Sequence, residues 1–398
     1  MRLFRSLPIF HVGRLVCCVW GGLLVVEVSL AASVIPSSDA LAVHEWGTFT
    51  SVAGPGGDAV YWQVLSGPPD LPCFVNRLSG RSLKGASTTI RMETPVLYFY
   101  AHRPMSVSVR VEFPQGLITE WYPRASRVQH SSFSPNSGSA IEWASFDVLP
   151  EAPFEFPVEN RPSHYYAARE TDASPLRMGE QQEKLIFYRG IGSFSVPLRV
   201  NLSGEGKLAL RNTGPDPIPA VIVFENRGGQ INYRRLGALD HEITVELPAR
   251  NGQIDPLRRE IEEVLIAQGL YPKEARAMVE TWRDSWFEEG TRVFYVVPNA
   301  IVESVLPLTV DPAPESLVRV FVGRVEILSS WREKEIEVAL AADDIRSLEK
   351  HGRFLQPFLQ QVRRRTDREL PVSPRLNEFL AAAYSRIQAE LESPACGK

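Results

Sequence analysis

The feature that most constrains this chain is an alternation of apolar and polar residues with period two, which runs from Leu41 to about Ala249. Residues two apart on a β-strand share a face, so this pattern predicts strands. Gly228-Gly229 predicts a tight hairpin because both positions accept a positive φ. Eleven short strands predict an antiparallel β-sandwich of two packed sheets. They are expected at residues 41–52, 90–101, 106–113, 117–122, 140–148, 184–190, 193–202, 207–212, 220–226, 230–236 and 242–247.

The pattern changes near Asn251, where helical spacing begins. Asp255-Pro256 has the form of a helix N-cap followed by proline. Strands return at 292–297 and 317–328, and helices are expected at 257–268, 272–287, 332–350, 354–364 and 374–391. The chain is thus predicted to be mainly β with a helical C-terminal portion. Either a β-sandwich domain at 41–250 precedes an α-rich region at 251–395, or the returning strands complete the first sheet.

The N-terminus has the three parts of a secretory signal peptide, assigned to residues 1–33. Arg2, Arg5 and Arg14 supply positive charge, and an apolar run of twelve residues spans 15–26. Ser29 and Ala31 occupy the −3 and −1 positions of a cleavage site. A secreted or periplasmic location is expected. The alternative is an uncleaved signal, which would be the only membrane contact.

Charge and cysteine content narrow the class of partner. Removing residues 1–31 takes three arginines and one glutamate from 43 basic and 47 acidic residues, which leaves a net charge of −6. Such a chain has no general attraction for nucleic acid, so no nucleic-acid partner is expected. Cys73 and Cys396 remain after signal removal and either pair or stay reduced.

Four short segments resemble a known family when taken together. They are His44–Ser51 (HEWGTFTS), Arg91–Val96, Thr119–Pro123 and Thr281–Phe287. The chain is similar over most of its mature length to a family of uncharacterised secreted bacterial proteins that begin, after the signal, with an HEWGTFTS stretch. The resemblance implies export and a shared fold, and it transfers no catalytic residue.

Motifs of common enzyme classes are missing from the sequence. His44-Glu45 and His241-Glu242 begin like a zinc-peptidase motif, but neither has the second histidine one helical turn later. No GxSxG, P-loop, GxGxxG or CxxC occurs. No cofactor and no metal site are therefore expected. A metal held by distant histidines, with His44 and His164 as weak candidates, is the remaining alternative.

Charged residues recur on strand faces that should be apolar. Glu45 shares a face with Val43 and Phe49 in the expected register, and Glu120 with Ile118 and Tyr122. Arg91 and Glu93 are expected beside Leu97 and Phe99, and Arg189 beside Leu185 and Phe187. Unpaired buried charge is costly, so these groups either form ion pairs or converge on a polar cleft. In the cleft interpretation Glu45, Glu93 and Glu120 are candidate acid–base residues, with Arg91 and Arg189 as anion-binding groups.

A second polar cluster spans residues 164–170. His164, Tyr165, Arg169 and Glu170 combine the residue types of polar recognition surfaces, but a strand with a wet edge has the same composition. Exposed tryptophans would stack on sugar rings, and the candidates are Trp62, Trp121 and Trp143, of which Trp121 joins the predicted binding residues.

Two functions remain open from the sequence. The first is a non-enzymatic exported binding or envelope-associated protein whose partner is a small molecule, a glycan or a protein. The alternative is a secreted hydrolase that uses paired carboxylates on a glycan-type substrate.

Overall fold

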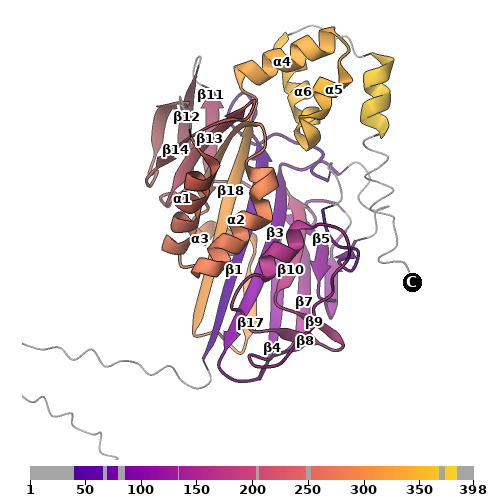
Figure 1. The fold of residues 1–398 in the computed structure, drawn as a ribbon, viewed down its shortest axis with the longest axis vertical. Helices are drawn as coiled ribbons and strands as arrows, with labels where there is room; N and C mark the ends of the chain where they lie inside the picture. The colour runs from indigo at the N-terminus through magenta and orange to yellow at the C-terminus, as the bar shows by residue number, and fades with distance from the viewer. Residues whose placement is uncertain are drawn as a thin grey trace, which may run out of the picture. The chain divides into compact units, whose positions relative to one another are not determined.

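The computed structural model describes residues 40–65, 70–78, 86–132, 134–202, 206–247, 252–366 and 373–382. Its largest element is a nine-stranded sheet in the order β14-β13-β16-β18-β1-β3-β10-β5-β2 (Figure 1). At its centre β1 pairs in parallel with β18, whereas β1 and β3 are antiparallel. The strands are β1 (Leu41–Val52), β2 (Asn76–Arg77), β3 (Ile90–Ala101), β5 (Gly116–Tyr122), β10 (Ile186–Gly192), β13 (Val221–Arg227), β14 (Gln230–Leu236), β16 (Gly290–Val296) and β18 (Ser316–Ile327).

Two smaller sheets cover one face of this sheet, which we call the inter-sheet face. Its apolar core joins Val43, Phe49 and Leu97 of the large sheet to residues of the smaller sheets such as Trp143 and Leu210. The six-stranded sheet holds β4 (Met105–Phe113), β6 (Arg127–His130), β7 (Ser139–Val148), β8 (Leu176–Met178), β9 (Gln181–Glu183) and β17 (Leu308–Asp311). The three-stranded sheet holds β11 (Leu198–Leu202), β12 (Lys207–Asn212) and β15 (Glu242–Glu246).

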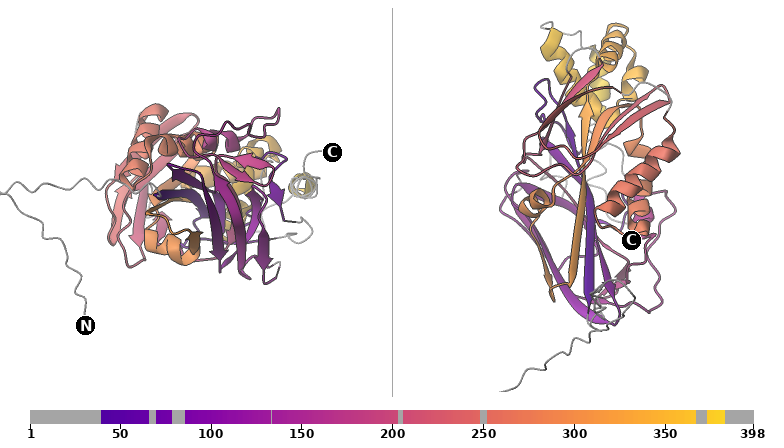
Figure 2. Two further views of the ribbon diagram at one scale, coloured as in Figure 1. Left: turned by 90° about the horizontal axis from the view of Figure 1, so that it is seen from below. Right: turned by 90° about the vertical axis from the view of Figure 1, so that its left-hand side faces the viewer.

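Helices cover the opposite face of the nine-stranded sheet, which we call the helix face. They are α1 (Ile254–Ala267), α2 (Pro272–Trp286) and the 3-10 helix η2 (His164–Arg169). Figure 2, on its right, shows α1 and α2 on one side of β18 and the six-stranded sheet on the other. The apolar stripe of α2 packs against Trp46, Tyr98 and Phe187, as its helical spacing predicts.

A third core forms where the strand ends meet the C-terminal helices. Val52, Leu117 and Ile191 pack there against Ile336 and Phe358. The helices are α4 (Ser330–Ala341), α5 (Ile345–Glu349), η3 (Gly352–Phe354) and α6 (Leu355–Thr366), while α3 (Asn299–Val305) precedes β17. None of the helices that the structure describes has both the length and the apolar character needed to cross a bilayer.

The predicted fold class is confirmed: the protein is mainly β, with packed antiparallel sheets and a helical C-terminal region. The returning strands β16 and β18 lie between β13 and β1, so they complete the large sheet. Two local predictions were wrong. The helix expected at 332–350 is split, because the left-handed backbone of Asp343 (φ 51°) separates α4 from α5. Gln253 rather than Asp255 is the N-cap of α1.

Candidate functional site

Some of the candidate residues lie on the opposite face of their strand from the one predicted, because the long strands contain bulges. In β3 the register to β1 shifts by one residue between Val96 and Glu93, beside Thr94, whose φ is 49°. A one-residue bulge inverts the faces beyond it. Arg91 and Glu93 therefore lie on the helix face, whereas Leu97 and Phe99 belong to the inter-sheet core, so that face assignment was wrong.

A similar shift affects Glu120. The β5–β10 register changes between Glu120 and Ile118, and Ile118 packs in the inter-sheet core while Tyr122 packs on the helix face. Glu120 accepts a hydrogen bond from Thr119 Oγ1 and lies opposite Arg189 in the register. The predicted faces of Glu45 and Arg189 are confirmed. Val43 and Phe49, on the face of Glu45, belong to the inter-sheet core. Leu185 and Phe187, on the face of Arg189, belong to the core on the helix face.

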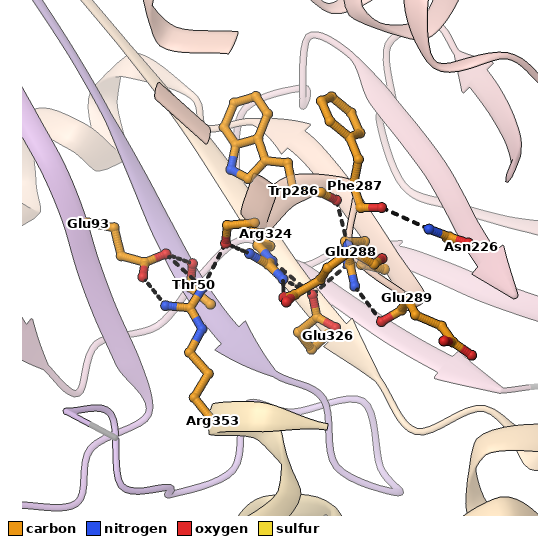
Figure 3. Close-up of polar contacts among 12 residues, drawn as sticks. Thr50, Glu93, Asn226, Trp286, Phe287, Glu288, Glu289, Arg324, Glu326 and Arg353 are labelled. Atoms are coloured by element: carbon orange, nitrogen blue, oxygen red, sulfur yellow. Dashed lines mark hydrogen bonds and ion pairs between the residues drawn. The ribbon is translucent and has the colours of Figure 1, made fainter. Parts of the chain in front are cut away.

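Glu93 is the best-connected of the candidate carboxylates. It is 1 % exposed and lies 3.3 Å from Arg91 Nε, so these two residues of one strand form an ion pair. Arg353, which lies in η3, and Thr50 Oγ1 also donate hydrogen bonds to it (Figure 3). Burial alone would raise the pKa of the Glu93 carboxyl, but Arg353 and Arg91 outweigh it and lower the pKa to about 2. Glu93 is thus ionised at neutral pH and cannot serve there as a general acid.

A second ionic centre lies beside it, around Glu326 on β18. The fully buried carboxylate lies 2.7 Å from Arg292 Nε and 2.7 Å from Arg324 Nη2, with Arg332 at 4.0 Å. Arg324 also contacts Ser285, and Ser285 contacts Arg353, so the two centres form one network across the helix face. Figure 3 shows Glu93 and Arg353 beside Arg324 and Glu326. These arginines hold the pKa of Glu326 below its usual value against the opposing effect of burial.

Arg189 forms a bidentate ion pair with Asp70 rather than facing an open cleft. Its two terminal nitrogens lie 2.9 and 2.7 Å from the two carboxylate oxygens of Asp70. Arg189 is 3 % exposed and Asp70 30 %. The pair satisfies the charge of Arg189, which leaves its guanidinium committed to the protein's own carboxylate.

Glu45 lies on the other side of the sheet, in the inter-sheet core. Its carboxylate is 2.6 Å from Arg319 Nε and accepts a hydrogen bond from the hydroxyl of Tyr188. Both charged side chains are almost completely buried, at 0 and 2 % exposure. Glu45 faces the inter-sheet core and Glu93 the helix face, so the structure does not bring Glu45 together with Glu93. Glu93 and Glu120 do lie near each other on the helix face, where both raise the pKa of the buried Arg189.

The two weak metal candidates, His44 and His164, have different contact partners. His44 Nδ1 lies 2.8 Å from Glu274 Oε2, and Tyr100 donates to the other oxygen of that carboxylate. His164 is the first residue of η2, and within the described part of the chain it forms no hydrogen bond or ion pair with His44. Within the part of the chain that the structure describes, no group of three or more potential ligands could hold a metal ion.

The cluster at residues 164–170 is a 3-10 helix, so the wet-edge strand was a wrong prediction. Ser163 is the N-cap of η2, and its hydroxyl accepts a hydrogen bond from the backbone N–H of Tyr165. Arg169 turns inward, donates two hydrogen bonds to Glu183, and packs among four aromatic rings that include Tyr165 and Tyr166. This arrangement anchors η2 to β9, and Glu170 is the one exposed residue among the predicted recognition residues.

The tryptophans and cysteines complete the account of the predicted residues. Trp62 and Trp143 are 0 and 1 % exposed and belong to the core, so they are not sugar-stacking residues. Trp121 is half-buried and packs against two of the apolar clusters. Cys73 is disulfide-bonded. Cys396 lies outside the described residues.

Four surface hollows formed by described residues have volumes between about 320 and 830 Å³. Neither Glu45, Glu93 nor Glu120 lines any of these four. The sequence interpretation also missed Asp70, Arg292, Arg319 and the Arg324–Glu326 pair. The last of these had a signal, since Arg324 and Glu326 are spaced two apart on a strand, as are Arg91 and Glu93.

Comparison with known proteins adds no family. No family model matches the chain, and no curated protein matches it. Two solved structures resemble it weakly: the Fcho1 mu homology domain of Danio rerio with a bound Eps15 peptide, and the yeast delta-COP-I mu-homology domain complexed with a Dsl1 WxWxV peptide. Their identities are 9 and 8 % and their TM-scores 0.30 and 0.25, and each match covers 72 % of this chain and 96 % of the other. Likenesses of this size carry no conclusion about activity.

Replacing Glu93 by alanine should destabilise the fold by roughly 3 kcal/mol, because Arg91 remains buried without its nearest carboxylate. Urea unfolding followed by circular dichroism measures the change. The control is Glu112→Ala in β4, whose carboxylate is 45 % exposed in its pair with Arg110 and should cost less than about 1 kcal/mol. An unchanged unfolding midpoint for Glu93→Ala would show that Arg91 finds solvent.

Stability should also fall as the pH drops below about 6.5, because of His351. Burial, together with Arg332 and Lys350, lowers the pKa of His351 to about 3. His351 therefore takes up a proton near pH 6.5 in the unfolded chain but only near pH 3 in the folded chain. Its contribution to stability is fully present above pH 6.5 and is lost as the pH falls from 6.5 to about 3. We expect a loss of roughly 2 kcal/mol between pH 6.5 and pH 5 in urea unfolding. His351→Leu should flatten this dependence, whereas His241→Leu, at an exposed position, should not.

Proposed function

We propose that this protein is an exported, non-enzymatic binding protein. One observation carries the proposal: each carboxylate that the sequence offers for acid–base catalysis is buried and committed to the protein's own cations or hydroxyls. Glu45 pairs with Arg319, Glu93 pairs with Arg91 and Arg353, and Glu120 accepts from Thr119. A glycoside hydrolase that uses paired carboxylates instead needs two carboxyl groups open to substrate, one of them protonated. The polar networks account for stability and specificity of the fold, which leaves function to the surface.

The test sets binding against turnover with the purified protein. A thermal-shift panel of glycans and peptides should raise the melting temperature for at least one compound, since a ligand of the folded state stabilises it by mass action. The same compounds should remain uncleaved after long incubation. Cleavage that is abolished by Glu45→Gln, Glu93→Gln or Glu120→Gln in a folded variant would overturn the proposal in favour of the hydrolase.

Export is part of the proposal and rests on the composition of residues 1–33. Arg2, Arg5 and Arg14 precede the apolar run, and Ser29 and Ala31 follow it. Sequencing the N-terminus of the protein recovered from the extracytoplasmic fraction should therefore begin at Ala32. Recovery of the intact N-terminus from membranes would favour the uncleaved anchor.

A further inference from the structure

A hollow of about 830 Å³ lies away from the ionic networks, where the β13–β14 hairpin, the ends of β11 and β15, and the first turn of α4 meet. Its wall combines an aromatic ring with polar groups of several kinds. The residues that matter for the argument are Glu225, Arg227, Gln230, Asn232, Ser329 and Trp331. A volume of this size exceeds that of a single small metabolite and falls within the range of ligand pockets.

Trp331 gives the hollow a fixed aromatic wall. The ring is half-buried, and its Nε1 donates a hydrogen bond of 2.9 Å to Glu225 Oε1. Thr291 donates to the same oxygen at 3.1 Å, which holds the carboxylate in turn. The exposed Arg227 guanidinium lies 5.3 Å from the ring centroid. The Arg332 guanidinium lies 5.7 Å from the same centroid. The ring is therefore held by its nitrogen and flanked by two arginines, and its exposed part offers an apolar surface at little entropic cost.

Ser329 is an independent indication of a ligand. It is 1 % exposed, it is the N-cap residue of α4, and its hydroxyl makes no capping hydrogen bond. Among the residues that the structure describes, Ser329 Oγ has no hydrogen-bond partner, although it lines the hollow. Buried polar atoms are almost always satisfied, and serine at an N-cap normally bonds the helix. The Ser329 hydroxyl is thus an unsatisfied group within the wall of the hollow, and a ligand's own hydroxyl group would satisfy it.

The chemistry of the wall selects one class of ligand. Glu225 and Arg227 contribute one charge of each sign, so a strongly anionic or cationic ligand would meet a like charge. Gln230 and Asn232 are amides that both donate and accept, and Trp331 with Leu202 and Leu247 supplies apolar surface. Saccharides match this set, because pyranose rings have apolar C–H faces and a rim of hydroxyl groups. We propose that this hollow binds a neutral saccharide, which rests on the proposed binding function.

The test titrates the full chain with four trisaccharides: cellotriose, maltotriose, mannotriose and the trimer of N-acetylglucosamine. At least one should bind saturably in isothermal titration calorimetry. Trp331→Ala should weaken that binding at least about tenfold, as loss of an aromatic anchor does. Trp331→Phe should lie between, and Ser329→Ala should weaken binding about threefold or more without lowering the melting temperature of the free protein. The matched control is Val338→Ala, on the same helix, 60 % exposed and outside the hollow.

The outcomes separate the site from the function. No binding of any of the four trisaccharides, alongside a peptide or another compound that raises the melting temperature, overturns the saccharide site and supports the binding function. Trisaccharide binding that survives Trp331→Ala overturns this location. Cleavage of a trisaccharide overturns the non-enzymatic function and supports the site if Trp331→Ala stops it.

Discussion

Glu326→Gln should destabilise the protein by about 4 kcal/mol or more, the largest effect expected of a single substitution here. The carboxylate is fully buried, and Arg292, Arg324 and Arg332 all lie within 4.0 Å of it. Glutamine keeps the size and one acceptor but removes the charge. The three guanidinium groups would then repel one another, with only the partly exposed carboxylate of Glu288, 2.7 Å from Arg324, to offset them. Since domains are stable by only about 5–15 kcal/mol, this substitution removes a large share of the total.

Chemical unfolding of Glu326→Gln is the measurement, and Glu289→Gln is its matched control. Glu289 is close in space, but its side chain is 33 % exposed. Its backbone carbonyl, not its carboxylate, accepts from Arg292 and Arg332. The control should therefore cost less than about 1 kcal/mol. Equal losses in the two variants would mean that Glu326 is hydrated in solution and that the network has no buried centre.

The sequence predicts the strands that carry these charged residues but not the partners with which the charges pair. The bounds of β1 and β3 were predicted correctly, at 41–52 and 90–101, because both segments are rich in β-branched and aromatic residues. Local pairs such as Arg91–Glu93 follow from the strand period of two. The decisive partners do not: Arg319 is 274 residues from Glu45, Arg353 is 260 from Glu93, and Asp70 is 119 from Arg189. Nothing local links such positions, since only the tertiary fold brings these strands, the loop that carries Asp70 and the 3-10 helix η3 together.

Bulges are the second limit. Thr94 in β3 and the shift beside Thr119 in β5 each move one residue out of register. In both strands, polar and apolar residues stand before and after the bulge. The sequence pattern therefore fits a strand with the bulge as well as a strand without it. The wrong face predicted for Arg91 and Glu93 arose from this ambiguity, because a strand without a bulge would place them with Leu97 and Phe99. The observed faces divide them instead between two cores.

Glu45 and Arg319 allow the structural role of such a pair to be separated from any chemical role. Glu45→Leu alone should cost about 4 kcal/mol, because Arg319 stays buried and the hydroxyl of Tyr188 loses its acceptor. Glu45→Leu combined with Arg319→Met should return to within about 1 kcal/mol of the parent protein, since well-packed apolar residues often replace a buried ion pair without loss. Unfolding of the parent, the two single variants and the double variant measures the coupling.

The double variant also bears on function. If Glu45 is purely structural, a folded Glu45→Leu/Arg319→Met protein should keep every ligand-induced rise in melting temperature that the parent shows. A double variant that folds as well as the parent but loses its ligand response would assign Glu45 or Arg319 to binding. A double variant no more stable than Glu45→Leu would show that Arg319 reaches water when its partner is removed. The pairing geometry predicts neither result, because both side chains are enclosed by the inter-sheet core at 0 and 2 % exposure.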